Sequence, residues 1–226
     1  MAKTCFYWVH LKRKLLSLHA QKDIQRHTLM NVAIIKYNAG NIYSVVNALR
    51  RLGTEPLLTD DPESIKAADR VIFPGQGEAS STMAYLRKHN LDKLIRDLRQ
   101  PVLGICIGQQ LLCRHSEEGD TQCIGIFDVD VKRFCPKRHE DKVPAMGWNT
   151  IGDLQSGLFK GMDDGEFVYF VHSYYVPVCQ WTAATAQYIT PYSAALHKDN
   201  FYTAQFHPEK SGAVGQRIIS NFLDNI

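Results

Sequence analysis

The 226-residue sequence predicts an α/β protein with a three-layer, doubly wound, mostly parallel sheet and appended antiparallel strands. Three observations support this class. Short β-branched runs alternate with helical patterns four times between residues 31 and 106, as in consecutive β–α–β units. Strand-like runs then follow one another between residues 125 and 206, and a helical pattern closes the chain.

The first half supplies the parallel part of the expected sheet. Its strand-like runs are short and rich in Val, Ile and Leu, and its helical stretches repeat apolar residues every three or four positions. Gly53 is placed to end the first helix. The expected strands are 31–37, 55–60, 71–75 and 101–106, and the expected helices are 41–53, a polar piece after 60, and 79–100.

The second half supplies the antiparallel part. Asp199 and Asn200 favour a turn that joins two strands into a hairpin. The expected strands lie within 125–134, 166–176, 182–188 and 193–206, and the final helix lies within 211–226. A hydrophobic content of 45% in a chain of this length is enough for one sizeable core, so residues 30–226 are expected to form one domain.

The N-terminal extension, residues 1–29, differs from the rest of the chain. Residues 1–30 carry six basic side chains and one acidic one, whereas residues 31–226 carry 20 basic and 22 acidic side chains. The formal charge of +3 therefore does not indicate nucleic-acid binding by the body. Three interpretations of the extension stand: upstream sequence read from an early start codon, a true appendage, or an organellar targeting peptide.

The six cysteines favour reduced thiols in a cytoplasm. A disulfide framework is typical of short secreted chains, and this chain is long and lacks a convincing secretory signal. No cysteine pair has CxxC spacing and no Cys/His set has zinc-finger spacing, so we expect neither a metal nor a cofactor. No apolar stretch approaches the roughly eighteen residues that a membrane span needs.

Cys106 stands at a sharp corner in LGICIGQQLL, residues 103–112. The run before it predicts a strand, and ligands bind at the carboxyl ends of parallel strands. Gly104 and Gly108 flank the cysteine as in a nucleophile elbow, where small residues relieve the crowding of a strand-to-helix turn. The following helix, expected to include Cys113, would favour a thiolate at its N-terminus. A buried structural cysteine is the alternative, and the flanking glycines favour the nucleophile.

A thiolate nucleophile needs a proton shuttle, and His207 in FHPEKSG is the strongest candidate among the nine histidines. It is expected at a strand end, with Pro208 fixing the turn. Glu209, two residues further on, can orient the imidazole and complete a Cys-His-Glu triad. His172, in VHSYY, is the competing histidine.

These motifs resemble the class I (triad) glutamine amidotransferases over residues 30–226. GICIGQQ is followed about a hundred residues later by FHPE. Within the family, five ordered motifs resemble the branch that supplies the glutaminase subunit of imidazole glycerol phosphate synthase: YNAGNIYSV, VIFPGQGEA, GWN, HSYYV and QFHPEKSG. Gln76 and Gln109 depart from that branch, which usually has an apolar residue and Met at these positions.

The resemblance implies that Cys106 attacks the side-chain amide of glutamine while His207, held by Glu209, moves the proton. It also implies how the substrate is held, with backbone N–H groups stabilising the oxyanion. Glu118, in the acidic loop SEEGD, would otherwise be taken as solvated, and Gln110 as a helix-surface residue. The implied residues are Gln76, Gly77 and Ile107 for the oxyanion, Gln110 and Glu118 for the amino group, and the Ser173-Tyr174 backbone for the carboxylate.

The resemblance further implies a heterodimer with a separate, barrel-shaped cyclase subunit. The cyclase joins ammonia to N'-phosphoribulosyl-formimino-AICAR nucleotide, giving imidazole glycerol phosphate and AICAR. Asn41, Trp148 and Lys210 would lie near the docking face, although Lys210 can also be an ordinary exposed lysine. Two alternatives remain: a glutaminase serving pyridoxal phosphate, purine or anthranilate synthesis, and a noncatalytic, thiol-sensing protein of similar fold.

Overall fold

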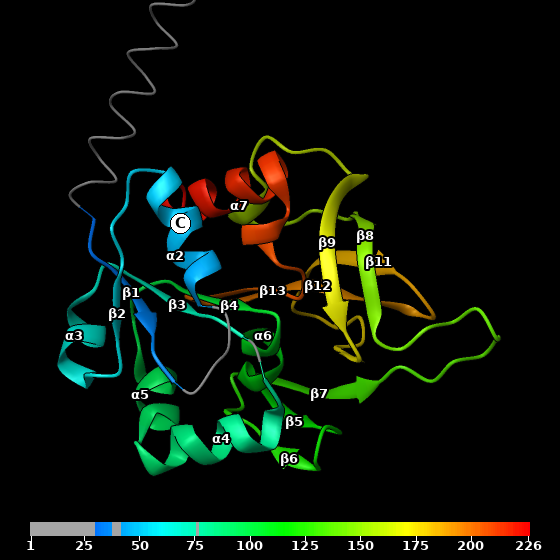
Figure 1. Ribbon diagram of the computed structural model, residues 1–226, viewed down its shortest axis with the longest axis horizontal. Coiled ribbons are helices and arrows are strands. Elements are labelled where there is room, and N and C mark those ends of the chain that lie inside the picture. The colour runs from blue at the N-terminus through cyan, green and yellow to red at the C-terminus, as the bar shows by residue number, and fades with distance from the viewer. Residues whose placement is uncertain (1–29, 38–41, 76) are drawn as a thin grey trace, which may run out of the picture.

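A seven-stranded sheet forms the centre of the protein (Figure 1). The computed structural model describes residues 30–37, 42–75 and 77–226. In order across the sheet, the strands are β11 (Thr182–Gln187), β12 (Pro191–Lys198), β13 (Phe201–Ala204), β4 (Val102–Ile105), β3 (Arg70–Phe73), β1 (Val32–Ile35) and β2 (Leu57–Thr59). The strands from β13 to β2 are parallel, and β12 and β11 add antiparallel pairs at one end. The predicted fold class is confirmed.

Helices cover both faces of this sheet (Figure 1). α2 (Tyr43–Arg51) and α7 (Gly212–Asp224) pack on one face. The other face carries α3 (Pro62–Ala67), α4 (Ala79–Lys88), α5 (Leu91–Asp97) and α6 (Ile107–Leu112). None of the helices in the described part of the chain is long and apolar enough to cross a membrane.

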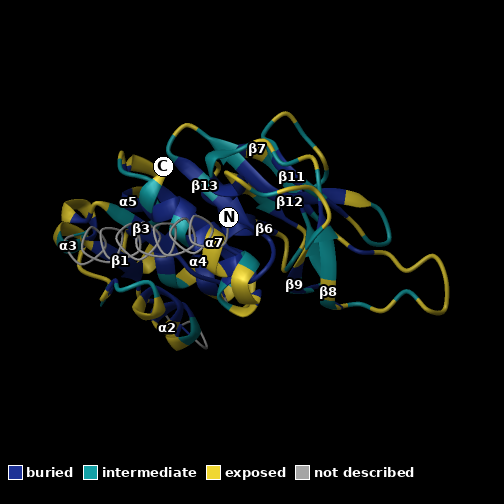
Figure 2. Cartoon of the chain, turned by 90° about the horizontal axis from the view of Figure 1, so that it is seen from above, coloured by how far each residue is buried: buried dark blue, intermediate teal, exposed yellow. Residues whose placement is uncertain are grey.

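Two apolar cores lie between these layers. Successive side chains of a strand point to opposite faces of the sheet, so β1 contributes side chains to both cores. Ile34 packs into the core that includes Leu49 of α2, whereas Ile35 packs into the core that includes Met83 of α4. Figure 2 shows the strands of the large sheet as mostly buried, while the loop 135–144 is mostly exposed.

Two helix boundaries differ from the prediction. The stretch 79–100 contains two helices because Asn90 adopts a left-handed backbone, with φ 56°, which ends α4 and starts α5 in a new direction. The helix after Cys106 ends at Leu112. Cys113 therefore does not share it, because Cys113 begins an extended strand that pairs with Phe127.

Two smaller sheets lie beside the antiparallel end of the large one. The first has the order β10 (Tyr174–Tyr175), β7 (Phe127–Arg133), β5 (Cys113–Ser116) and β6 (Thr121–Gln122). The second is a ribbon of β8 (Ala145–Ile151) and β9 (Glu166–His172), in which Trp148 lies opposite Tyr169. The sequence predicted β7, β9 and β10. It did not predict β5, β6 or β8. β5 lies where the helix after Cys106 was expected to continue, β6 has only two residues, and β8 is interrupted by Gly147.

Both ends of the described chain lie at the amino edge of the parallel strands. The carbonyl of Asn31, just before β1, accepts a hydrogen bond from the N–H of Asp69 at 2.8 Å. The next residue, Arg70, starts β3 and donates to the carbonyls of Phe222, at 3.2 Å, and Ile226. The opposite edge, where β4 leads into Cys106, is thus free of both ends of the described chain.

Candidate active site

Cys106 is the corner between β4 and α6. Its backbone has φ 54° and ψ −110°, a conformation that costs a non-glycine residue roughly 1–3 kcal/mol. The neighbouring glycines make the corner possible, because a Cβ atom on Gly108 would clash with the carbonyl of Phe73, and one on Gly104 would lie 2.9 Å from the Leu112 side chain. The Cys106 N–H donates to the Ala204 carbonyl at 2.7 Å, which ties the corner to β13. The expected strand-to-helix elbow is present.

His207 follows β13, the parallel neighbour of β4, so both residues leave the sheet at its carboxyl edge. A one-turn 3-10 helix, Pro208–Lys210, brings Glu209 back toward the imidazole. His207 Nδ1 lies 2.8 Å from Glu209 Oε1, and the two side chains are 3% and 2% exposed. His207 Nε2 is buried and has no hydrogen-bond partner among the described residues. That nitrogen is therefore available to exchange a proton with a reacting group.

The charge state of His207 depends on its neighbours. Burial lowers its pKa, but the neighbouring Cys106 sulfur and the Glu209 carboxylate both favour the protonated ring, outweigh burial and raise the pKa above its ordinary value. A protonated imidazole beside the Cys106 sulfur is therefore favoured. This is the arrangement that an activated cysteine nucleophile requires.

His172, the competing histidine, has the opposite character. Burial lowers its pKa to about 4, so its ring is neutral near pH 7. Nδ1 donates to the Tyr174 carbonyl at 2.7 Å, and the ring packs against Phe134 and Tyr192 at centroid distances of 5.3 and 5.2 Å. The geometry therefore favours His207 as the proton shuttle and makes His172 a core residue that holds the backbone of Tyr174.

Gln110 lies inside the protein and is only 4% exposed. Its Nε2 donates to the Tyr174 carbonyl at 3.1 Å and to Gln205 Oε1 at 2.9 Å. Gln110 Oε1 has no hydrogen-bond donor among the described residues. This orientation leaves the oxygen as the acceptor for a ligand, and it ties α6 to the Ser173-Tyr174 segment.

Glu118 is bound rather than freely solvated. Its Oε2 accepts a hydrogen bond from the N–H of Ala79, at the start of α4, at 2.8 Å. Burial raises the pKa of the carboxyl, the nearby Glu78 raises it further, and the Ala79 N–H acts in the opposite direction. Glu118 thus lies beside the loop that precedes α4, the loop expected to stabilise the oxyanion.

That loop rests directly on the elbow. A Cβ atom on Gly75 would clash with the carbonyl of Ile105 and the backbone nitrogen of Gly108. Gly77 has φ 137°, which only glycine adopts without strain. Ile107 is the first residue of α6, so its N–H has no intrahelical acceptor. Gln76, like Asn41 of the expected docking face, lies outside the described residues.

The outer face of the β8/β9 ribbon is apolar and exposed. Trp148 is 56% exposed, and its ring meets that of Tyr169 edge-on at 6.0 Å. Lys210 Nζ lies 5.9 Å from the centre of the same Tyr169 ring. The structure therefore brings Trp148 and Lys210 to one tyrosine that the sequence did not single out. We call this surface the ribbon face; it comprises Met146, Trp148, Phe167, Tyr169 and Lys210.

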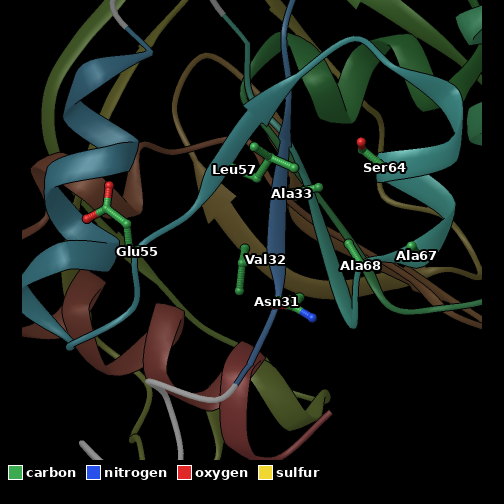
Figure 3. Close-up of a pocket in the computed structure, with 8 residues that line it drawn as sticks. All are labelled: Asn31, Val32, Ala33, Glu55, Leu57, Ser64, Ala67 and Ala68. Carbon is green, nitrogen blue, oxygen red and sulfur yellow. The ribbon is translucent and has the colours of Figure 1, made fainter.

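A hollow of about 260 Å³ lies at the opposite, amino edge, between β1, β2 and α3 (Figure 3). Two of its polar side chains are already engaged. Ser64 Oγ donates to Asp61 at 2.6 Å, and Glu55 forms an ion pair with Arg50 at 2.6 Å. None of the predicted site residues lines this hollow, which agrees with the rule that parallel sheets bind ligands at their carboxyl edge.

Comparisons with known proteins agree with this geometry. A family model described as "Glutamine amidotransferase class-I" matches residues 33–226. Imidazole glycerol phosphate synthase subunit HisH of Bacteroides fragilis (strain YCH46) is 66% identical over 195 residues, covering 86% of this chain and 100% of the relative. The protein of the same name from Escherichia coli (strain K12) is 46% identical over 200 residues, with the same coverages.

A solved structure extends the agreement to the fold. A glutamine amidotransferase crystal structure superposes with a TM-score of 0.66 at 17% identity, covering 86% of this chain and 98% of that chain. The architecture is thus shared well beyond recognisable sequence similarity. The chain belongs to the class I glutamine amidotransferase family.

Proposed function

We propose that this chain is the glutaminase subunit of an imidazole glycerol phosphate synthase, which hydrolyses glutamine and passes ammonia to a separate cyclase subunit in histidine biosynthesis. One observation carries the chemistry: Cys106 and the buried His207–Glu209 pair meet at the carboxyl edge of one parallel sheet. The choice of synthase is supported by relatives of that name that match over their whole length at 66% identity. Glutaminases of pyridoxal phosphate, purine or anthranilate synthesis are the alternative.

The first half of the reaction forms a thioester. The Cys106 thiolate attacks the side-chain carbonyl carbon of glutamine, and the carbonyl oxygen becomes an oxyanion. The N–H of Ile107 and an N–H of the Gly75–Gly77 loop are suited to stabilise it, and each such donor is worth roughly 3–4 kcal/mol of barrier. Protonated His207 then gives its proton to the leaving nitrogen, and ammonia departs.

The second half regenerates the thiol. Neutral His207 removes a proton from water, the hydroxide attacks the thioester carbonyl, and glutamate leaves as Cys106 recovers its sulfur. Glu209 keeps the Nδ1 proton facing its carboxylate, so that Nε2 performs both transfers. A buried pair suits this task because no other described group competes for the Nε2 atom.

Substrate is held by groups on both sides of Cys106. Gln110 Oε1 and the Glu118 carboxylate are acceptors suited to the ammonium group of glutamine. The Ser173-Tyr174 backbone is assigned to the α-carboxylate, for which only its N–H groups can be donors. Bonds from Gln110 and His172 to the Tyr174 carbonyl fix the orientation of this segment. Residues 30–226 constitute the amidotransferase domain, and no metal or cofactor takes part in these steps.

We assign the ribbon face to the cyclase. Trp148 and Lys210 lie there beside the Tyr169 ring, and the Tyr169 backbone carbonyl accepts a hydrogen bond from the backbone N–H of His207 at 2.9 Å. The face is therefore directly connected to the catalytic turn, so that docking can change the site. We place this heterodimer in the cytoplasm, in keeping with the free thiols of all five cysteines in the described part of the chain.

The test is glutamate release by the full chain, alone and with a purified cyclase loaded with its nucleotide. The chain alone should be slow, and the loaded cyclase should stimulate it about 100-fold or more, the effect of supplying one oxyanion donor. The matched variant Trp148→Ala should keep the unstimulated rate and lose most of the stimulation. A high rate without the cyclase, or stimulation by another synthase in its place, would contradict the assignment.

A further inference from the structure

Gln205 is a buried amide next to the proposed nucleophile, and neither the triad nor the expected substrate contacts include it. Its side chain is 0% exposed, and its backbone N–H donates to the Ala194 carbonyl at 2.8 Å. Its Nε2 lies 3.8 Å from the Cys106 sulfur, and its Oε1 accepts a hydrogen bond from Gln110 Nε2 at 2.9 Å. The residue therefore touches both the nucleophile and a residue expected to bind substrate.

The orientation of this amide is determined by its partners. Gln110 presents an NH₂ group, so Gln205 must present its oxygen there and its own NH₂ group to the sulfur. A flipped Gln205 would place two NH₂ groups against each other and a carbonyl oxygen against a thiolate. A hydrogen bond donated to the charged form of a group favours that form, so the fixed amide favours the thiolate.

The same row of hydrogen bonds continues beyond Gln110. Gln110 Nε2 also donates to the Tyr174 carbonyl, which receives a second bond from His172 Nδ1. The row thus runs from the sulfur, through two amides, to the backbone expected to hold the glutamine carboxylate. Because Gln205 Oε1 accepts one of the two hydrogens of Gln110 Nε2, and the Tyr174 carbonyl accepts the other, the Gln110 oxygen is left facing the ligand.

We propose that Gln205 is a positioning residue of the glutaminase site with two separable effects. Its Nε2 holds and stabilises the Cys106 thiolate, and its Oε1 sets the orientation of Gln110. This inference rests on the proposed function, because it takes Cys106 as the nucleophile. The two ends of one amide predict two different kinetic consequences.

Two variants of the full chain distinguish the effect of the Nε2 contact from the effect of the Oε1 contact. Gln205→Met removes both polar contacts at similar volume, whereas Gln205→Glu keeps an acceptor for Gln110 and removes the donor to the sulfur. The rate of Cys106 alkylation by iodoacetamide is followed between pH 6 and 9 by mass spectrometry of the peptide that contains it. The kcat and KM for glutamine are measured with the loaded cyclase.

Both variants should slow Cys106 alkylation at pH 7 about tenfold or more, since a hydrogen bond to a charged group is lost. In Gln205→Glu the half-maximal alkylation rate should also move to higher pH. Gln205→Met should raise KM severalfold in addition, whereas Gln205→Glu should lower kcat with KM within about twofold of the parent. A merely structural role would lower the melting temperature without moving the pH profile of alkylation.

Gln109→Met is the matched control. Gln109 is equally buried, at 0% exposure, and has two hydrogen bonds of its own, to the Ser193 carbonyl at 3.1 Å and from Thr203 Oγ1 at 2.7 Å. This variant should lose stability and keep the alkylation rate of Cys106 within twofold.

The outcomes distinguish the two proposals. If Cys106 in both Gln205 variants alkylates at the parent rate, the role of Gln205 is overturned while the glutaminase stands. If Cys106 of the parent reacts no faster than the exposed Cys135 and glutamine gives it no protection, the proposed function itself fails. If Gln205→Met does not fold, Gln205→Glu alone decides, because it retains the contact with Gln110.

Discussion

The two edges of the parallel sheet differ in whether their polar side chains have hydrogen-bond partners. At the amino edge, two polar side chains that line the hollow of Figure 3, Ser64 and Glu55, are already paired with near neighbours. At the carboxyl edge, the Nε2 atom of His207 and one oxygen of Glu209 are buried without partners in the described chain. A buried pair of titratable groups with unused hydrogen-bonding capacity, and not the size of a hollow, therefore indicates where chemistry takes place.

The largest expected effect at the carboxyl edge comes from Cys106→Ala in the complex with the cyclase. Glutamine-dependent synthesis should fall by roughly 10⁴-fold or more, because a triad acts as a unit. Synthesis from a high concentration of ammonium salt should stay near the parent rate, since ammonia needs no thiolate. Both rates are measured as formation of imidazole glycerol phosphate.

Cys113→Ala is the control for that variant, because Cys113 is buried at the start of β5 and has no part in the triad. It should cost some stability and leave both nitrogen sources equally effective. Retained glutamine-driven turnover in Cys106→Ala would remove the distinction between the two edges.

The pH dependence of folding stability tests the assignment of His172 as a buried, neutral core residue. Its pKa is about 4 in the folded protein and near 6.5 when unfolded, so the unfolded chain binds the proton first as pH falls. The stability present above pH 6.5 should therefore decrease by about 3 kcal/mol as pH falls from 6.5 to 4. Urea unfolding at several pH values measures this slope.

His172→Asn keeps a donor for the Tyr174 carbonyl and removes the titrating ring. Its stability should be lower at pH 7 and should change less between pH 7 and pH 4 than that of the parent. An unchanged acid slope in the variant would assign the pH dependence to other groups.

The smallest expected effect concerns the amino edge. Removing residues 1–29 should leave the melting temperature and the glutaminase rate of the complex nearly unchanged, because β1 starts at Val32 and the site lies at the other edge. Thermal unfolding and glutamate release check this. A clear loss of stability in the shortened chain would show that the segment packs on the core.

Much of the fold was predictable because its signals are local. The apolar runs around Ile34 and Leu103 are β-branched or leucine-rich, and the glycines around Cys106 lie next to it in sequence. Asn90 could not be identified as a helix break from periodicity, because apolar residues continue at helical spacing on both sides of it. Its left-handed conformation depends on how α4 and α5 pack on the sheet.

The unpredicted site residues depend on long-range contacts. Gln205 was part of a quoted motif, yet its role follows from contacts with Cys106 and Gln110, 99 and 95 positions away in sequence. Tyr169 gains its place on the ribbon face from pairing with Trp148 across two strands. No spacing within one segment reports such contacts, and only the hydrogen-bond pattern distinguishes a buried amide that positions a thiolate from one that fills a core.

The position of the described chain ends has a consequence for joining this chain covalently to the proposed cyclase. Asn31 and Ile226 both lie near Arg70, at the edge of the sheet opposite Cys106. A linker attached at Ile226 would therefore start at the edge of the sheet opposite the ribbon face's catalytic neighbour, His207. A single-chain version joined through Ile226 needs a long tether, whereas an affinity tag or surface anchor at Ile226 should leave the ribbon face open.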